Sequence, residues 1–338
     1  MKGFGMKVNG EGMDLNKMTP RNILILKPRL DIPFGKSAYL NNPRADLEPI
    51  RVHWNKFAHA VEDHYTERQE NVHVLEVPLW QMTPNIVEHF NADLTFVPHK
   101  EKHNFDCGLQ PVAYYMQMVF PWIFSVDHQG WCAGDSKWPI DYNFKGNNVS
   151  VFEALKTQMP NNESKFPQPD RKEFDKDGFI FFPCQIPHDQ TIMNHSDIEV
   201  IDALRMACQL AKKLKLKVVA KGHPVNTGSM APLKQLAKEY PNCTWVENVS
   251  VHDLLEKCEA VITVNSGVGM EAILHEKPVF TFGRADYSAV SINVDSFDSL
   301  ESNWEDRMEC IQFYEGFINN WYYSHHDYSN MGVGAELP

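Results

Sequence analysis

Two apolar strands that each end in small and polar residues constrain this chain more than any other feature of its sequence. Residues 260–264 (AVITV) form a continuous apolar run, as in a parallel strand buried on both faces. The turn at 265–269 (NSGVG) then leads into a predicted helix at 270–275. Residues 218–220 form another apolar strand, which ends at 221–224 (KGHP). The pattern predicts an α/β fold with ligand-binding loops at the strand ends.

The turn at 265–269 has the composition of a phosphate cradle. Gly267 and Gly269 let the backbone approach a ligand, and Ser266 can cap the helix or donate to a phosphate. The free N–H groups of the first helical turn carry partial positive charge. An ordinary strand-to-helix turn would have the same composition, because a short glycine motif is weak by itself.

Two more strand ends carry polar groups. Pro224 fixes the chain after His223, and Lys221 adds a positive charge, so this segment is predicted to clamp a nucleotide. A third strand at 179–182 is followed by a loop with polar side chains: Gln185, His188, Asp189, His195 and Ser196. Loops at the carboxyl ends of parallel strands converge on one crevice, and we expect all three loops at one site.

The run 179–287 resembles the capsule polysaccharide synthesis and export proteins whose catalytic modules are β-Kdo transferases using CMP-Kdo. Four motifs carry the resemblance: 183–196 (PCQIPHDQTIMNHS), the His-Pro step in KGHP, 265–279 (NSGVGMEAILHEKPV) and 282–287 (FGRADY). The resemblance implies a GT-B glycosyltransferase, in which two Rossmann-like domains face each other across a cleft and the second holds the nucleotide. In GT-B proteins the last helix commonly crosses back to the first domain.

The resemblance also implies roles for individual residues. Asp189 is the expected nucleophile, because the family resembles retaining enzymes, and Gln185 and His195 would orient the sugar or its carboxylate. Glu271 would reach the ribose or the base. The residues expected to bind the nucleotide sugar are Gln185, Lys221, His223, Pro224, Asn265, Ser266, Gly267, Gly269, Glu271 and Arg284.

The first domain departs from the family at the residue that acts on the acceptor hydroxyl. The family has a carboxylate, usually glutamate, before a glycine and an aromatic residue, but here two residues separate Asp127 from Gly130 and no glutamate is present. Asp127, after a predicted strand at 122–126, is the candidate, and Asp135 is the alternative. A structural loop cap is the other interpretation of Asp127.

Length and alternating strands and helices predict two α/β domains, since 338 residues exceed the usual size of one core. The predicted division is a flexible leader at 1–20, an N-terminal Rossmann-like acceptor domain at 21–160, a connection at 161–178, a C-terminal nucleotide-sugar-binding domain at 179–300, and a C-terminal helix and tail at 301–338. A DxD at 175–177 precedes a strand and is interpreted as a solvated loop. We therefore expect no metal site and no cofactor besides the donor substrate CMP-Kdo.

The amino-acid composition limits which partners and which cellular compartment the chain can be expected to have. A net charge of −12 without a basic stripe argues against general nucleic-acid binding. Seven cysteines without a CxxC pair, and a polar first segment, favour a reducing cytoplasm. No apolar run reaches the roughly 18 residues that cross a bilayer, so any membrane contact would be peripheral, at its inner face.

The sequence thus predicts a metal-independent, retaining glycosyltransferase. It would move an acid sugar, Kdo, from a CMP-activated donor to a glycan or glycolipid acceptor in capsule or surface polysaccharide synthesis. A sialyltransferase-like enzyme or a nucleotide-sugar epimerase of GT-B layout is one alternative class. A non-catalytic carbohydrate-binding homologue is another.

Overall fold

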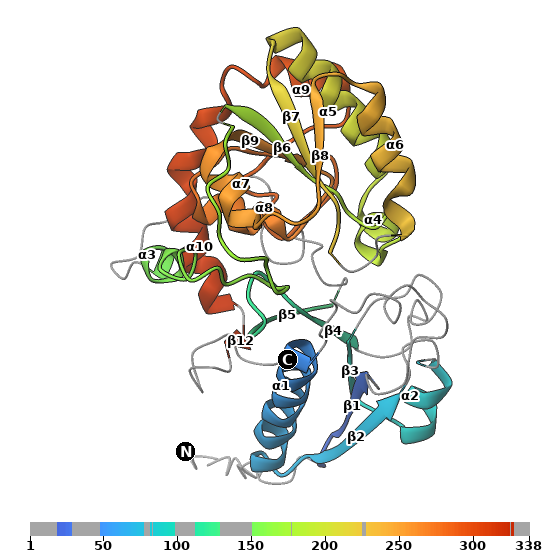
Figure 1. The fold of residues 1–338 in the computed structure, drawn as a ribbon. Coiled ribbons are helices and arrows are strands. Elements are labelled where there is room, and N and C mark those ends of the chain that lie inside the picture. The colour runs from blue at the N-terminus through green and yellow to red at the C-terminus, as the bar shows by residue number, and fades with distance from the viewer. Residues whose placement is uncertain are drawn as a thin grey trace, which may run out of the picture.

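The computed structural model describes residues 19–28, 48–77, 82, 84–98, 112–128, 151–176, 178–224, 228–324 and 326–327. Figure 1 shows two α/β domains, one above the other, each built on a sheet of six described strands. The lower domain contains the first sheet and the upper one the second.

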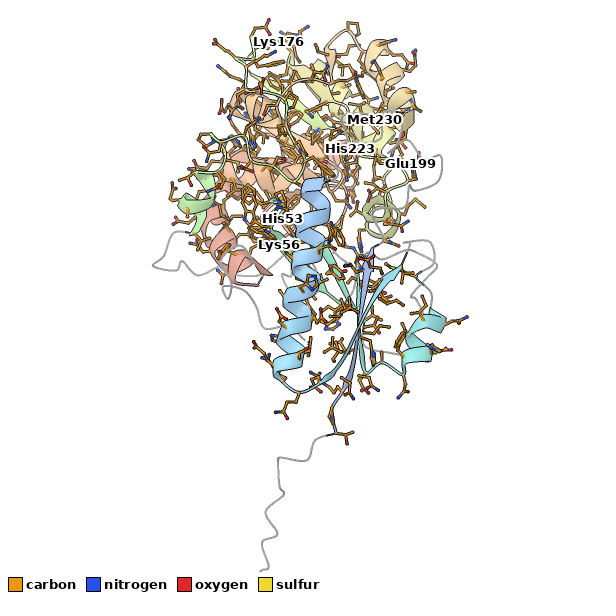
Figure 2. The ribbon with its side chains drawn as sticks, turned by 60° about the horizontal axis from the view of Figure 1, so that its bottom comes forward. His53, Lys56, Lys176, Glu199, His223 and Met230 are labelled. Atoms are coloured by element: carbon orange, nitrogen blue, oxygen red, sulfur yellow. The ribbon has the colours of Figure 1, made fainter. Side chains whose placement is uncertain are left out.

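The first sheet has the order β12-β5-β4-β3-β1-β2. Its strands are β1 (Asn22–Pro28), β2 (Asn71–Val77), β3 (Leu94–Val97), β4 (Val112–Gln117), β5 (Ile123–Asp127) and β12 (His326–Asp327). Alternate residues of β1 enter different cores: Ile23 packs on the side of α1 (Glu48–Glu67), and Leu24 on the side of α2 (Pro84–Phe90). In Figure 2, α1 lies beside the sheet with His53 and Lys56 toward its upper end. This first strand is therefore buried on both faces, as its NILIL sequence predicts.

The second sheet is entirely parallel in its described strands, with the order β11-β10-β9-β6-β7-β8. These strands are β6 (Phe179–Pro183), β7 (Lys217–Lys221), β8 (Cys243–Val246), β9 (Cys258–Thr263), β10 (Val279–Thr281) and β11 (Ile292–Asn293). The chain proceeds from β6 to one side through β7 and β8, then returns to β9 on the other side. The boundary between β6 and β9 is the topological switch point, outside which such sheets bind ligands.

Helices surround this second sheet. They are α4 (Gln190–His195), α5 (Val200–Leu214), the 3₁₀ turn Gly228–Met230, α6 (Ala231–Glu239), α7 (Val251–Lys257), α8 (Val268–Leu274) and α9 (Phe297–Ser302). The strands predicted at 179–182, 218–220 and 260–264 are confirmed as β6, β7 and β9. The segment after β6, predicted as a loop, contains the short helix α4. No helix in the described parts is long and apolar enough to span a bilayer.

The end of the chain returns to the first domain. After the 3₁₀ helix Arg307–Phe313, α10 (Tyr314–Ser324) packs on α3 (Val151–Lys156), and β12 then pairs antiparallel with β5. This crossing of the last helix agrees with the expected GT-B layout, whereas the strand β4 and the helix α3 were not predicted from the sequence. Although α3 falls within the predicted first domain, it contacts α8 and α10. One apolar cluster also joins residues of both domains, including Phe120, Ile123, Phe317 and Trp321.

A pair of histidines fixes the connection to the second domain. The Nε2 atom of His252 lies 2.8 Å from the carbonyl oxygen of Glu163, and its Nδ1 lies 3.0 Å from Nε2 of His275. Because a carbonyl only accepts, His252 carries its proton on Nε2, and its Nδ1 accepts from His275. Burial lowers the pKa of His252, and burial with nearby positive charge lowers the pKa of His275 to about 3. Both rings are therefore neutral in the folded protein at neutral pH.

We expect the fold to lose stability in acid through this pair. The ordinary histidine pKa is about 6.5, so the unfolded chain binds more protons between pH 6.5 and 3, and the free energy of unfolding falls as the pH falls through that window. The slope is at most about 1.4 kcal/mol per pH unit for each proton taken up. Urea unfolding at several pH values should give a shallower dependence for His275→Gln. The exposed His59→Gln is the control, and an unchanged slope in His275→Gln would refute this explanation.

Candidate functional site

The carboxyl ends of β6 and β9 are joined by buried amides at the switch point. Gln185 Oε1 accepts from the backbone N–H of Asn265 at 3.0 Å and from Thr263 Oγ1 at 3.1 Å, while its Nε2 donates to Asn265 Oδ1 at 2.9 Å. Asn265 Nδ2 then donates to the carbonyl oxygens of Thr191 at 3.0 Å and Arg284 at 3.2 Å. These two side chains therefore fix four segments relative to one another.

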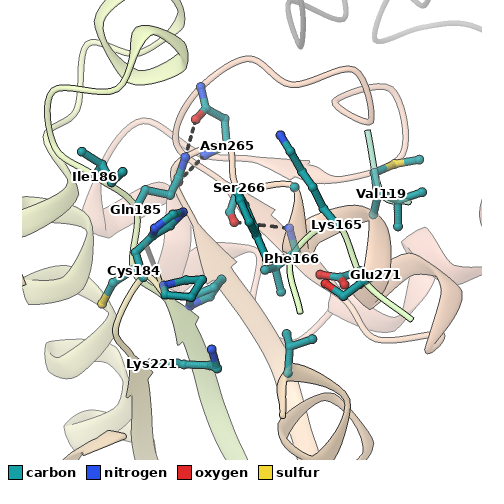
Figure 3. Close-up of a pocket in the computed structure, with 18 of the residues that line it drawn as sticks. Val119, Lys165, Phe166, Cys184, Gln185, Ile186, Lys221, Asn265, Ser266 and Glu271 are labelled. Carbon is teal, nitrogen blue, oxygen red and sulfur yellow. Dashed lines mark hydrogen bonds between the residues drawn. The ribbon is translucent and has the colours of Figure 1, made fainter. Parts of the chain in front are cut away.

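A pocket opens beside this network, between the end of β4 and the ends of β6, β7 and β9 (Figure 3). It brings together many of the residues predicted from the sequence: Gln185, Asp189, Lys221, His223, Pro224, Asn265, Ser266, Gly267 and Glu271. Residues 116–119, at the end of β4 and just after it, contribute the wall from the first domain. The expectation that three strand-end loops converge on one crevice is confirmed for these residues.

Opposite charges lie together inside the pocket. Lys221 ends β7 and is buried, and burial lowers its pKa against the opposing effect of Glu271. Burial raises the pKa of Glu271 to about 7, against the effects of a Ser164 hydrogen bond and of Lys221 and Lys165. Its Oε1 atom has no hydrogen-bond partner among the described residues. Glu271 therefore exchanges its proton near neutral pH and has an oxygen available for a ligand.

His223 is neutral at physiological pH. Burial lowers its pKa to about 4; the Asp189 carboxylate opposes this shift, and Lys221 and Lys165 add to it. A neutral imidazole has one nitrogen that donates and one that accepts. The ring also meets Phe166 edge to face, at 5.6 Å between centroids. His223 can thus donate one hydrogen bond to a phosphate.

Asp189 is the N-cap of α4. Its Oδ1 atom accepts from the backbone N–H of Thr191 at 3.0 Å and from Thr191 Oγ1 at 2.8 Å. The side chain is half-buried and lines the pocket. Both bonds use the same oxygen, so capping occupies only one side of this carboxylate.

His195 and Arg284 lie outside the residues that line the pocket. Arg284 Nη2 is 3.3 Å from His195 Nδ1, and the Arg284 backbone N–H donates to the His195 carbonyl oxygen at 2.8 Å. The pair links the end of α4 to the segment after β10. His195 is therefore not among the lining residues, which include Asp189, and Asp135 lies outside the described residues. For Asp127 only the backbone, at the end of β5, is described.

Sequence reasoning missed the contribution of the connection between the domains. Ser164, Lys165, Phe166 and Gln168 line the pocket, although the polar composition of 161–178 predicted only a linker. The one local signal was an aromatic residue next to a lysine within a polar stretch. Among the described residues, no group of three or more His, Cys, Asp or Glu side chains is placed to hold a metal ion.

The two glycines of the turn have different surroundings. A Cβ atom on Gly269 would lie 2.2 Å from the Tyr287 ring, which is 1% exposed and donates its hydroxyl to the Ser266 carbonyl oxygen at 2.5 Å. A Cβ atom on Gly267 would meet nothing within 4 Å. Gly267 faces the pocket, whereas Gly269 lets Tyr287 pack against the turn and does not line the pocket.

We therefore expect Gly269→Ala to destabilise the protein by about 1 to 3 kcal/mol, the usual cost of overpacking a core. Gly267→Ala is the matched control and should unfold within about 0.5 kcal/mol of the wild type, as a surface change does. Chemical denaturation of the two variants tests this. Equal stabilities would contradict the distinction between them.

Known proteins share parts of this sequence. A family model described as Capsule polysaccharide biosynthesis protein matches residues 147–323. The capsule polysaccharide export protein KpsS of Escherichia coli is 31% identical over 146 residues, which are 40% of this chain and 38% of that protein. Protein FixF of Sinorhizobium fredii (strain NBRC 101917 / NGR234) is 25% identical over 216 residues, 60% of this chain and 52% of that protein. The chain thus spans about half or less of the length of these relatives.

A solved structure shares the fold. KpsC of Thermosulfurimonas dismutans, described as a beta Kdo 2,4 transferase, has a TM-score of 0.50 and 16% sequence identity, covering 76% of this chain and 85% of that one. The predicted GT-B fold, two Rossmann-like domains facing each other across a cleft, is thereby confirmed. Since the family match covers more than half of the 338 residues, the chain belongs to the capsule polysaccharide biosynthesis protein family.

Proposed function

We propose that this chain is a glycosyltransferase that moves the acid sugar Kdo from CMP-Kdo to a glycan or glycolipid acceptor in capsule or surface polysaccharide synthesis. The observation that carries the proposal is the pocket at the switch point, where Lys221, His223 and Glu271 meet in a chain of this family. A protein of the same fold, KpsC of T. dismutans, is described as a beta Kdo 2,4 transferase, which supports the choice of donor.

The pocket has groups suited to a nucleotide monophosphate. Lys221 supplies positive charge at the end of β7, and the neutral imidazole of His223 supplies a hydrogen-bond donor. Glu271 is proposed to accept from a ribose hydroxyl or the base through the oxygen that has no described partner. With the phosphate charge met by side chains, we propose that donor binding needs no metal ion.

The proposed reaction has two displacements. A carboxylate oxygen of Asp189 attacks the anomeric carbon of Kdo, the bond to the phosphate oxygen breaks, and CMP leaves with the electron pair. An acceptor hydroxyl then attacks the same carbon and loses its proton to a base, for which Asp127 is proposed and Asp135 is the alternative, while the ester to Asp189 breaks. Two inversions give net retention, as a β-linked product from a β-configured donor requires.

The position of Asp189 in the same pocket as His223 supports its proposed role in the first step. Both side chains line the pocket, and the Asp189 carboxylate opposes the lowering of the His223 pKa, which supports their proximity. A phosphate bound by His223 would therefore bring the anomeric carbon close to the carboxylate. The loop of Asp189 is fixed through Thr191, whose carbonyl oxygen accepts from Asn265.

The first expected result is CMP binding in the presence of EDTA, measured by titration calorimetry. His223→Ala should weaken it by about 1 to 3 kcal/mol, because a hydrogen bond to a charged phosphate is lost. His188→Ala is the control, since this side chain is exposed and does not line the pocket. Tighter binding of UDP than of CMP, or an absolute need for magnesium, would refute the proposed donor.

The second expected result concerns Asp189→Asn. Asparagine caps helices as well as aspartate does, so the variant should fold normally and bind CMP, yet lose sugar transfer because the amide is a poor nucleophile. Intact-protein mass spectrometry of the wild type with CMP-Kdo and no acceptor should show a Kdo-sized adduct that the variant lacks. Wild-type turnover by Asp189→Asn would eliminate this role, and an adduct on another residue would transfer it there.

A further inference from the structure

The segment 162–168 forms one wall of the pocket, and hydrogen bonds attach it to the second domain. Gln168 Oε1 accepts from the backbone N–H of Val251 at 3.0 Å, and its Nε2 donates to the carbonyl oxygen of Phe166 at 3.0 Å. Ser250 Oγ donates to Asn162 Oδ1 at 2.6 Å. The start of α7 therefore holds this segment at both ends, and the histidine pair holds Glu163 between them. The backbone that carries the pocket side chains is consequently fixed in place.

Two side chains of this wall reach the pocket together. Phe166 meets the His223 ring at 5.6 Å between centroids and 77° between planes. The Nζ atom of Lys165 lies 5.6 Å from the centroid of the same phenyl ring. Figure 3 shows Lys165, Phe166 and Glu271 among the side chains that line the pocket. One ring thus contacts both the imidazole and the ammonium group.

The charges around the pocket favour an anion near Lys165. Among the described lining residues, the cations are Lys165 and Lys221 and the acids are Asp189 and Glu271. Lys221 is 7% exposed and lies beside Glu271, whereas Lys165 is more exposed. The charge of Lys165 acts on both Glu271 and His223, so its ammonium group lies near the part of the pocket that these two residues line.

We infer that Lys165 binds the phosphate of the nucleotide and that Phe166 is a positioning residue, which directs Lys165 and His223 to the same phosphate group. This inference rests on the proposed nucleotide-binding function and adds two residues to it. The segment between the domains is then part of the donor site and not only a covalent link.

Lys165→Met tests the first role. It should weaken binding of CMP by about 10- to 100-fold, as loss of a charge-assisted contact does, and binding of cytidine by less than about twofold, because cytidine has no phosphate. The salt dependence of CMP binding should also become shallower. Lys165→Arg should retain most of the affinity.

Lys176→Met is the matched control. Lys176 belongs to the same connection, but its Nζ lies 3.4 Å from Thr244 Oγ1, and Figure 2 places it at the far end of the second domain from His223. This variant should bind CMP as the wild type does. An equal loss in both variants would overturn the inference, since it would reflect net charge only.

Phe166→Leu tests the positioning role. It should weaken CMP binding by about 3- to 10-fold and raise the pKa of His223, followed by NMR, because a smaller side chain admits water to the imidazole. Phe166→Tyr should restore both properties. An unchanged titration of His223 in Phe166→Leu would overturn the positioning role.

The outcomes separate this inference from the proposed function. If the wild type binds none of CMP, UMP and UDP, the proposed function fails and this inference fails with it. If the wild type binds CMP and Lys165→Met binds it equally well, only the phosphate-binding role of Lys165 fails.

Discussion

The pairing of Gln185 with Asn265 is the interaction on which the site depends. Both amides are buried, and each hydrogen bond between them joins segments that are distant in sequence. Removing one partner would leave a buried polar group without its bond, at a cost of about 1 to 3 kcal/mol. The ends of β6 and β9, the start of α4 and the segment of Arg284 all take their positions from this pair. The pocket is the space that they leave beside it.

Burial shifts the pKa of two groups in the pocket, Glu271 and His223, toward their uncharged forms. Glu271 has a pKa of about 7, and His223 stays uncharged until the pH approaches 4. An anion entering the pocket meets a neutral hydrogen-bond donor at His223 and an exchangeable proton at Glu271, while Asp189 is the other acid among the described lining residues. The same burial that shifts these groups also excludes water, which strengthens their interactions with a ligand.

The sequence predicted most of what depends on local pattern. Apolar runs identified β1, β6, β7 and β9, and the rule that parallel strands place their loops at one edge predicted the common position of Lys221, His223 and Ser266. Lys165 could not be predicted as a pocket residue because its position depends on bonds from Gln168 to the distant helix α7. The packing of Gly269 against Tyr287 could not be predicted either, because only the folded chain brings these two residues together. Asp189 both caps α4 and lines the pocket, so its structural role is compatible with the proposed catalytic one.

The apolar cluster that Phe120 and Ile123 share with Phe317 and Trp321 also governs how the two domains can move. All four side chains are completely buried, and the cluster lies where α10 passes from one domain to the other. Separating the domains on this side would expose the cluster to water, at roughly 25 cal/mol for each Å² of apolar surface. The two domains are therefore joined by a shared apolar core as well as by the covalent chain, and any motion that pulled them apart at this edge would have to break that core.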